Sequence, residues 1–430
     1  MDRNWPILSL KECGVTLIDC VHKTPAPVED GYPYVAIPQI KDGRIEVSST
    51  RRISEADFKT WTKKALPEPN DIVLSRRCNP GETAYVPDDL QFALGQNLVL
   101  LRSNGERIYP PFLRWLVRSP EWWEQIRRFL NVGAVFDSLK CADVPNFKLP
   151  IPPLREQRAI ASILGALDDK IELNRKMSAT LEAMARAIFT SWFVDFDPVR
   201  AKVEGRSIGL APEIVALFPD SLQESEYDEI PRGWNVGNLG DVSVNERRGL
   251  SHHDISDHTP YIGLDHMPRR CVALDRWDDS EGLESNKSVF RRGEILFGKL
   301  RPYFHKVGIA PIDGVCSTDI LVVAPKMPEW DSFVLGHITS DALIAHTDQC
   351  STGTRMPRAS WSHIAEFSVI LPSSEVAVAY NAIVSPMMAR IIANIHESRT
   401  LSALRDVLLP KLISGELRVS EAERNLEMSA

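Results

Sequence analysis

One string in this sequence could bind a nucleotide phosphate. Residues 293–299, GEILFGK, match the spacing G-x-x-x-x-G-K of a phosphate-binding loop. Leu300 follows the lysine, so the hydroxyl that would hold a magnesium ion is missing, and the intervening residues are typical of a strand. No G-x-G-x-x-G opens a helix either. We therefore expect no nucleotide site, and a stand-alone NTPase is the weakest hypothesis.

A second group of residues could suggest a metal site. His252, His253, Asp254, Asp257 and His258 lie close together in the sequence, but their spacing is irregular. Metal ligands must converge and be supported from behind, so a solvated or DNA-facing loop is favoured. No G-x-S-x-G or other nucleophile–base pattern is present. The sequence thus predicts no catalytic, metal or cofactor residue in this chain.

Basic residues instead occupy loop positions in both halves of the chain. Any single pair is more typical of a solvated face, but Arg76-Arg77 and Lys299/Arg301 follow strands that look equivalent. Arg and Lys at such places can contact guanine edges or phosphates. A glycine in the loops at 133–136 and 353–356 allows either close approach to a phosphate or a tight turn. The candidate DNA-binding residues are Arg51, Arg52, Arg76, Arg77, Asn79, Arg247, Arg248, Arg269, Arg270, Lys299, Arg301 and Arg355.

Composition limits the class of protein. The chain has 430 residues, enough for two or more domains, and its 43% hydrophobic and 25% charged residues are typical of a globular protein. A net charge of −8 argues against a general polyanion binder, so any nucleic-acid surface is local or completed by a partner. Seven scattered cysteines without a C-x-x-C pair indicate reduced thiols in the cytoplasm. We expect no apolar run long enough to span a bilayer.

Two long helices are expected to position these loops. From Ile160 onward apolar residues recur at alternating steps of four and three, with polar residues at the centre of the seam, and the pattern returns near the C-terminus. Two ordinary amphipathic core helices are the alternative. A helix of 40 residues is roughly 60 Å long, which suits a spacer. The expected helix-pair interface comprises Ile160, Leu164, Leu167, Ile171, Asn174, Leu181, Ile188, Ile391, Asn394, Leu401 and Leu408.

The repeat extends beyond the helices. A shift of 220 residues places Gly133 on Gly353 and Asn174 on Asn394, which indicates a duplicated unit. We therefore predict an α/β (α+β) fold with an internal twofold repeat and an antiparallel coiled coil. The expected parts are a domain at 1–150, a long helix at 151–193, an extended acidic linker at 194–230 in which EIVALF could form a short docking helix, a second domain at 231–370, a second long helix at 371–415 and a flexible tail at 416–430.

These motifs closely resemble the specificity subunit of type I restriction-modification enzymes. The resemblance covers essentially the whole chain and rests on PIPPLREQ at the start of the first helix, SWFVDFDPV after it, GWNVGNLGDV at the second domain and EILFGKLRPY within it. The second helix departs from the pattern, because it reads SSEVAVAYNAI and contains Pro386. That proline should kink or break the helix near Ser385.

The resemblance implies that each domain is a target recognition domain for one part of a split, asymmetric double-stranded DNA sequence. The two helices would act as a ruler that holds the domains about one DNA turn, roughly 34 Å, apart. It further implies two methyltransferase subunits, which carry S-adenosylmethionine, and restriction subunits, which use ATP and Mg. No membrane is expected as a partner. The alternative from another class is a coiled-coil scaffold that binds only protein.

Overall fold

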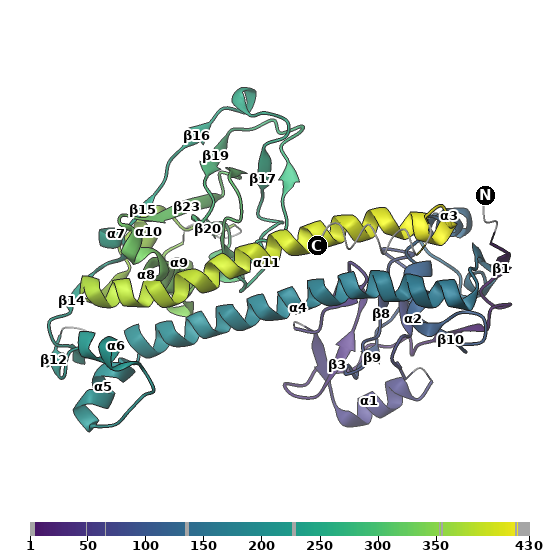
Figure 1. The fold of residues 1–430 in the computed structure, drawn as a ribbon, viewed down its shortest axis with the longest axis horizontal. Coiled ribbons are helices and arrows are strands. Elements are labelled where there is room, and N and C mark those ends of the chain that lie inside the picture. Colours follow the sequence, from purple (N-terminus) through teal and green to yellow (C-terminus); the bar gives the residue numbers. More distant parts are fainter. Residues whose placement is uncertain are drawn as a thin grey trace. The chain divides into compact units, whose positions relative to one another are not determined.

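Two compact units make up the chain in the computed structural model, which describes residues 5–48, 50–64, 66–133, 137–225, 229–351, 353, 356–417 and 419. The first unit comprises Met1–Asp169 and Leu401–Ala430, and the second comprises Lys170–Thr400. Each unit contains one α+β domain and a stretch of two long helices, α4 (Leu154–Phe193) and α11 (Ser374–Ser414), drawn in Figure 1.

The domain of the first unit is built on a four-stranded antiparallel sheet in the order β2-β10-β7-β8. A second sheet, β6-β3-β9, contains one parallel pair, and β1 pairs with β11 just before α4. Alternate residues of β7 enter different cores, because Ile72 and Leu74 pack with α2 and α3 whereas Val73 faces β3 and β9. The elements are β1 (Ile7–Ser9), β2 (Val15–Asp19), β3 (Tyr32–Val35), β4 (Ile40–Lys41), β5 (Arg44–Ile45), β6 (Arg51–Ile53), α1 (Glu55–Thr62), β7 (Ile72–Ser75), β8 (Thr83–Tyr85), β9 (Ala93–Leu94), β10 (Leu98–Ser103), α2 (Pro110–Leu116), α3 (Pro120–Phe129), η2 (Val144–Asn146) and β11 (Lys148–Pro150).

The domain of the second unit has the same plan. Its four-stranded antiparallel sheet runs β15-β23-β20-β21, and a five-stranded sheet, β16-β19-β22-β17-β18, contains the parallel pair β17–β22. The elements are β14 (Asn235–Asn238), α7 (Leu239–Val242), β15 (Ser243–Asn245), β16 (Gly249–Leu250), η3 (His252–Asp254), β17 (Pro260–Ile262), β18 (Asp278–Asp279), β19 (Lys287–Phe290), β20 (Ile295–Gly298), η4 (Pro302–Phe304), β21 (Val307–Ile309), β22 (Gly314–Cys316), β23 (Ile320–Pro325), η5 (Pro328–Trp330), α8 (Asp331–Ile338), α9 (Asp341–Cys350), α10 (Trp361–Ala365) and β24 (Ser368–Leu371).

Strand order and strand sense confirm the twofold repeat. The order β2-β10-β7-β8 of the first unit corresponds one by one to β15-β23-β20-β21 of the second. The parallel pairs β3–β9 and β17–β22 also correspond, with Tyr34 and Tyr261 at the same place in them. A last pair, β1–β11 or β14–β24, leads into each long helix. The fold is therefore a duplicated α+β domain with a helix pair.

In the first unit α4 and α11 pack side by side along the seam read from the sequence. Ile160, Leu164 and Leu167 are buried in one apolar core with Leu408, and Leu401 packs against its edge. Arg405 of α11 and Asp168 of α4 form a buried charged pair at the end of this stretch. Arg405 donates through Nη1 to Asp168 Oδ1 at 2.6 Å, Arg405 also pairs with Asp406, and Arg118 Nη1 lies 3.8 Å from Asp168 Oδ2.

In the second unit the same helices meet through buried amide and hydroxyl groups, with the partly exposed carboxylate of Glu397 accepting from Asn174 Nδ2 at 2.8 Å. Asn394 Nδ2 donates to Ser178 Oγ at 3.2 Å, and Asn174 Nδ2 lies 3.4 Å from Ser398 Oγ. Tyr380 donates to the carbonyl of Ala185 at 3.4 Å. Partner numbers fall along α11 as they rise along α4, so the helices are antiparallel. Around these layers Ile171 and Ile391 are buried, and Leu181 and Ile188 are half-buried.

The expected break at Pro386 is absent from α11, whose residues are all described. One helix runs from Ser374 to Ser414. Pro386 is exposed, whereas Val384 and Met388 on either side of it are buried. Ala382, whose carbonyl loses its hydrogen bond to the proline, is exposed as well, so water can satisfy that carbonyl without ending the helix.

The expectation of an extended linker at 194–230 was wrong for the described residues, except that EIVALF contributes to a short helix as the sequence allowed. This segment forms α5 (Asp197–Glu204), α6 (Pro212–Leu217) and the hairpin of β12 (Leu222–Glu224) and β13 (Glu229–Pro231). Its acidic composition hid a set of apolar anchors. Val199 and Phe218 are buried, and the Phe218 ring lies 4.9 Å from that of Trp192 at the end of α4. Burial of these side chains folds the segment onto the second unit.

The expectation that no run could span a bilayer was also too strong. By length and composition α11 could cross a membrane, since an 18-residue window has a mean hydropathy of 1.5. Its apolar residues are not all exposed, because 39% of that window is buried, including Tyr380, Val384 and Ile391. A helix that packs against α4 in both units passes the same composition test, so this finding is weak evidence for a membrane span.

Candidate nucleic-acid interface

The first candidate loop joins β7 to β8 and carries Arg76, Arg77 and Asn79. Arg76 N donates to Asn97 O at 2.9 Å, and Arg76 O accepts from Leu139 N at 2.9 Å. Arg77 forms an isolated antiparallel bridge with Ser138. Arg77 and Asn79 are exposed, and Arg76 is half-buried. The backbone of this loop is thus fixed on both sides while two polar side chains face outward.

The second candidate loop joins β20 to β21 and has the same backbone connections. Lys299 N donates to Asp319 O at 3.0 Å, and Lys299 O accepts from Ala359 N at 2.9 Å. Leu300 forms an isolated antiparallel bridge with Arg358, as Arg77 does with Ser138. The two loops are therefore the same hairpin of the two domains, each clamped by the segment that precedes the last strand. The sequence had paired Arg76-Arg77 with Lys299/Arg301, and the structure places them on these equivalent hairpins.

The side chains of the second hairpin are arranged around Phe304. The guanidinium carbon of Arg269 lies 4.0 Å from the centroid of the Phe304 ring, and that of Arg301 lies 5.9 Å from it. Tyr303 packs edge-on against Phe304, with ring centroids 4.7 Å apart, and is 47% exposed. Such contacts between guanidinium groups and aromatic rings are attractive and orient the cation.

Two further candidates are engaged by carboxylates. Arg248 pairs with Glu294, and its Nε lies 3.6 Å from Glu246. Arg270 pairs with Asp341 at the start of α9, with 2.8 Å between Nη1 and Oδ1. Both arginines therefore link loops to the body of the domain, and their charge is locally balanced.

The remaining candidates lie elsewhere. Arg51 and Arg52 are exposed on β6, and their guanidinium groups donate to the carbonyls of Pro25 at 2.9 Å and Gly31 at 2.7 Å. Arg247 is exposed on the loop before β16. Arg355 lies outside the described residues, as does most of the loop 133–136. The structure thus brings Lys299, Arg301, Arg269 and Arg270 together at the second hairpin. The arginines of β6 belong to a different sheet from the first hairpin.

His305 helps to hold the second hairpin in place, and it was not among the candidates taken from the sequence. Its ring is 3% exposed, and Nε2 lies 3.0 Å from the carbonyl of Thr339. Burial, helped by the positive charge of Arg270, lowers the pKa of His305, so the ring is neutral near pH 7. Because a neutral imidazole donates from one nitrogen, we assign the proton to Nε2. His305 therefore ties the second hairpin to the end of α8.

The phosphate-loop string does not form a loop. Ile295–Gly298 is strand β20, and all of its residues are buried. Hydrogen-bonding groups of this backbone are used in ladders with β21 and β23. The string therefore belongs to the sheet core. The His252 cluster forms the short helix η3, where His252 N donates to Asn286 Oδ1 at 3.3 Å.

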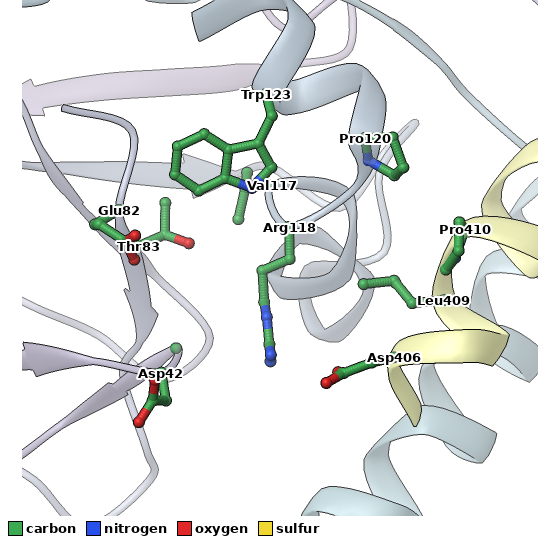
Figure 2. Close-up of a pocket in the computed structure, with 11 residues that line it drawn as sticks. Asp42, Glu82, Thr83, Val117, Arg118, Pro120, Trp123, Asp406, Leu409 and Pro410 are labelled. Atoms are coloured by element: carbon green, nitrogen blue, oxygen red, sulfur yellow. The ribbon is translucent and has the colours of Figure 1, made fainter. Parts of the chain in front are cut away.

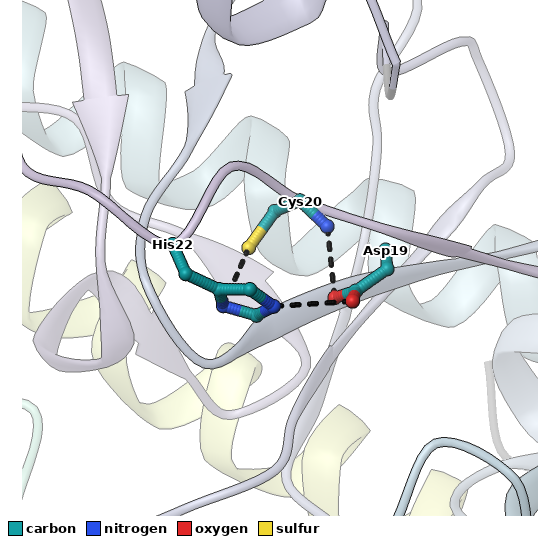
Figure 3. Close-up of side chains that lie close together, drawn as sticks. All are labelled: Asp19, Cys20 and His22. Atoms are coloured by element: carbon teal, nitrogen blue, oxygen red, sulfur yellow. Dashed lines mark hydrogen bonds and ion pairs between the residues drawn. The ribbon is translucent and has the colours of Figure 1, made fainter.

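A second histidine cluster, Asp19, Cys20 and His22, has the residue types of a metal site (Figure 3). The two ring nitrogens of His22 face different partners, because Nε2 lies 3.1 Å from Asp19 Oδ2 and Nδ1 lies 3.9 Å from Cys20 Sγ. A single ion takes only one of these nitrogens. The Cys20 thiol donates to Gly95 O, and its burial raises the pKa of the thiol. Hydrogen bonding accounts for this cluster without an ion.

A cavity of about 360 Å³ in the first unit is lined by β8, α2, α3 and α11. Figure 2 shows Arg118 pointing between Asp42 and Asp406. Burial raises the pKa of Glu82 at the cavity wall, and Asp42 adds to the rise. Burial lowers the pKa of Arg118, with a contribution from Arg405. The residues that line the cavity carry charges of both signs around Arg118. They include no nucleophile–base pair.

Comparisons with known proteins agree with this arrangement. The family model described as "Type I restriction modification DNA specificity domain" matches residues 26–183. The type I restriction enzyme MjaIX specificity subunit of Methanocaldococcus jannaschii is 25% identical over 379 residues, covering 86% of this chain and 83% of that protein. The HindI specificity subunit of Haemophilus influenzae is 25% identical over 421 residues, covering 84% and 89%.

A solved structure supports the fold over the full length. The S subunit of a type I restriction-modification system from M. genitalium covers 95% of this chain and 96% of its own, with a TM-score of 0.53 and 16% sequence identity. The duplicated domains with a helix pair are thus a known architecture. Over most of its length the chain is thus similar to specificity subunits of type I restriction-modification enzymes, and its residues 26–183 match the model of their DNA specificity domain.

Proposed function

We propose that this chain is the DNA-reading subunit of a type I restriction-modification complex and has no catalytic activity of its own. Each domain would read one part of a two-part, asymmetric double-stranded sequence. The single observation that carries the proposal is the pair of equivalent hairpins. Each hairpin joins the last two strands of its four-stranded sheet, and each loop is held by the same backbone bonds. Each also carries cations, with Arg77 on the first and Lys299 on the second.

The partners follow from the same proposal. Two methyltransferase subunits would supply S-adenosylmethionine chemistry on adenine, and restriction subunits would use ATP and Mg, so this chain needs no cofactor. Its net charge of −8 is unfavourable for a duplex, and partner subunits would provide much of the cationic surface around the DNA. The complex would act in the cytoplasm, where the target DNA is.

The experiment is a map of adenine methylation in DNA from cells that contain the full chain and its methyltransferase partner. We expect a two-part motif with a constant spacer. Arg77→Ala should weaken or relax reading of one part, and Lys299→Ala should act on the other, because the two residues lie on different domains. Equal damage to both parts would show that the assignment of one domain to each part is wrong.

The helices provide a second test. Adding one helical turn to α4 and one to α11, each in its coiled-coil register, should change the spacer length while both half-sequences stay the same. An unchanged spacer would contradict the role of the helices as a ruler.

A further inference from the structure

The arginines on and around the second hairpin fall into two groups by their partners. Arg248, Arg270 and Arg358 each pair with at least one carboxylate. Arg269 differs, because among the described residues no carboxylate pairs with it, yet its guanidinium lies on the Phe304 ring at 4.0 Å. Arg269 is exposed. It is therefore an ordered cation whose hydrogen-bond donors are not taken by an acid.

The position of Phe304 is set by the fold and not by Arg269. The ring belongs to the short helix η4, which lies between two residues with left-handed backbone, Arg301 at φ 52° and His305 at φ 52°. Neither residue is glycine, so both conformations are strained and must be held by their surroundings. His305 supplies that hold through its buried ring and its contact with Thr339 O. Phe304 is thus a fixed platform.

The neighbourhood of Arg269 is positively charged. Burial lowers the pKa of Lys306, and the positive charge of Arg269 lowers it further, while the carboxylate of Asp265 acts in the opposite sense. Lys306 Nζ donates to the carbonyl of Leu264, so this amine is held in place. Arg301 adds a guanidinium on the same ring. Such a cluster attracts the electronegative face of DNA.

We infer that Arg269, oriented by Phe304, is a base-reading residue of the second domain and that its target is a guanine. This inference rests on the proposed function and names what one loop of it reads. A guanidinium held on a ring presents its donors in a fixed direction, which suits the O6 and N7 acceptors of guanine in the major groove. An oriented guanidinium can also grip a phosphate with two bonds, but such a contact carries no base information, so loss of discrimination at a single base separates the two targets.

The first hairpin has no equivalent platform. Its loop residues 76–82 read RRCNPGE and contain no aromatic side chain. Arg76 and Arg77 are positioned by the backbone alone, through Leu139 and Ser138. In the first domain arginines such as Arg114 lie on rings outside the hairpin loop, on Tyr85 and Trp115. An arginine oriented by an aromatic residue of the hairpin loop itself is therefore particular to the second domain, and its loss should affect one half of the recognised sequence.

The test uses the full chain with its methyltransferase subunit and a library of duplexes in which the wild-type motif is varied one base at a time. For Arg269→Ala we expect discrimination at one guanine of one half-site to fall by roughly tenfold to a hundredfold, the range expected for one bidentate arginine contact. Arg269→Lys should lose the same discrimination, because an ammonium cannot make the two parallel bonds. Phe304→Leu should lose part of it, with the charge retained.

Arg292→Ala is the matched control, since it removes an exposed cation at the other end of β20 and should leave base preferences unchanged. Full discrimination in Arg269→Lys, or an even loss at all positions in Arg269→Ala, would overturn the inference in favour of a phosphate contact. A partial loss in Phe304→Leu supports the inference only if Arg269→Ala loses discrimination at the same base. Arg269 is exposed, so its substitution leaves the core intact. If the wild-type complex recognises no two-part motif, the proposed function fails instead, so the two failures are distinguishable.

Discussion

In the first unit α4 and α11 meet through the buried charged pair of Asp168 and Arg405, whereas in the second they meet through the amides of Asn174 and Asn394. The strand order around these helices is the same in both units. Duplication has therefore kept the backbone and the apolar seam while the polar contacts diverged. Polar groups in a seam cost stability but restrict register and partner, so each unit has its own means of alignment.

A similar difference lies in the helices that cover the main sheets. A shift of 221 residues places Phe112 of α2 on Phe333 of α8 and Leu116 on His337. His337 is buried among aromatic rings, with Phe333 at 4.5 Å and Phe189 at 4.8 Å. The second unit thus carries a titratable group where the first has an aliphatic one. The two units should respond differently to acid.

The largest expected effect comes from breaking the charged pair of the first unit. Asp168→Asn leaves Arg405 and the nearby Arg118 without their shared carboxylate, so we expect a loss of about 3–5 kcal/mol in the unfolding free energy of that unit. Amide hydrogen exchange in α2 and in residues 154–169 measures it. The double change Asp168→Leu with Arg405→Leu removes both charges and should recover most of the loss. A double variant as unstable as the single one would show that the pair is not the cause.

A second prediction concerns acid. Burial lowers the pKa of His337 from 6.5 to about 3, so the unfolded chain binds this proton first and stability falls as pH drops below 6.5. Burial raises the pKa of Asp331 from 3.8 to about 6, so the folded chain binds that proton first and stability rises as pH drops below 6. At pH 5 the first effect removes about 2 kcal/mol and the second restores about 1 kcal/mol.

His337→Phe should therefore remove the larger part of the acid loss in the second unit. Acidification from pH 7 to pH 5 should destabilise that unit by about 2 kcal/mol less than in the wild type, while His305, whose pKa burial also lowers, keeps its own contribution. Urea unfolding at the two pH values, followed by hydrogen exchange in α8, measures the change. Asp331→Asn is the control and should make the acid loss steeper than in the wild type. A pH profile unchanged by His337→Phe would mean that His337 does not titrate as its burial requires.

A third prediction concerns the backbone of the first hairpin. Cys78 is exposed and has a left-handed conformation, with φ at 65°, whereas the second hairpin has two such residues. Cys78→Val should lower the unfolding free energy by about 1 kcal/mol, because a β-branched side chain fits that conformation poorly. Cys78→Gly should instead raise it slightly or leave it unchanged. Thermal unfolding of both variants gives the comparison, and equal effects would argue against backbone strain there.

The sequence was sufficient for the features that depend on periodicity and repetition. The spacing of Ile160, Leu164 and Leu167 identified the buried side of α4. The repeat identified the matching of β7 with β20 because strand residues keep their alternation even where loops change. Local pattern and fold agree at all these places.

Side-chain partners could not be predicted in the same way. The basic pair Arg269-Arg270 looks uniform in sequence, yet Phe304 orients the first and Asp341 neutralises the second. Phe304 lies 35 residues after Arg269, and Asp341 lies 71 residues after Arg270, so only the folded domain brings these partners together. The aromatic pair in RPYFHK was the one signal that could have pointed to this platform. Likewise the sequence did not show that Pro386 lies on the exposed side of α11, where a proline can be accommodated without ending the helix. Which side is exposed is decided by tertiary packing.

The smallest expected effect separates surface charge from buried charge on the same two helices. Lys170 Nζ lies 3.3 Å from Glu397 Oε1, with side chains 38% and 41% exposed. Water and salt screen such a pair, so Lys170→Ala should change the unfolding free energy of the second unit by under about 0.5 kcal/mol. Urea unfolding at low and high salt measures it against Asp168→Asn. A loss comparable to that of Asp168→Asn would mean that exposed charges, and not the buried amides of Asn174 and Asn394, hold the helices together in that unit.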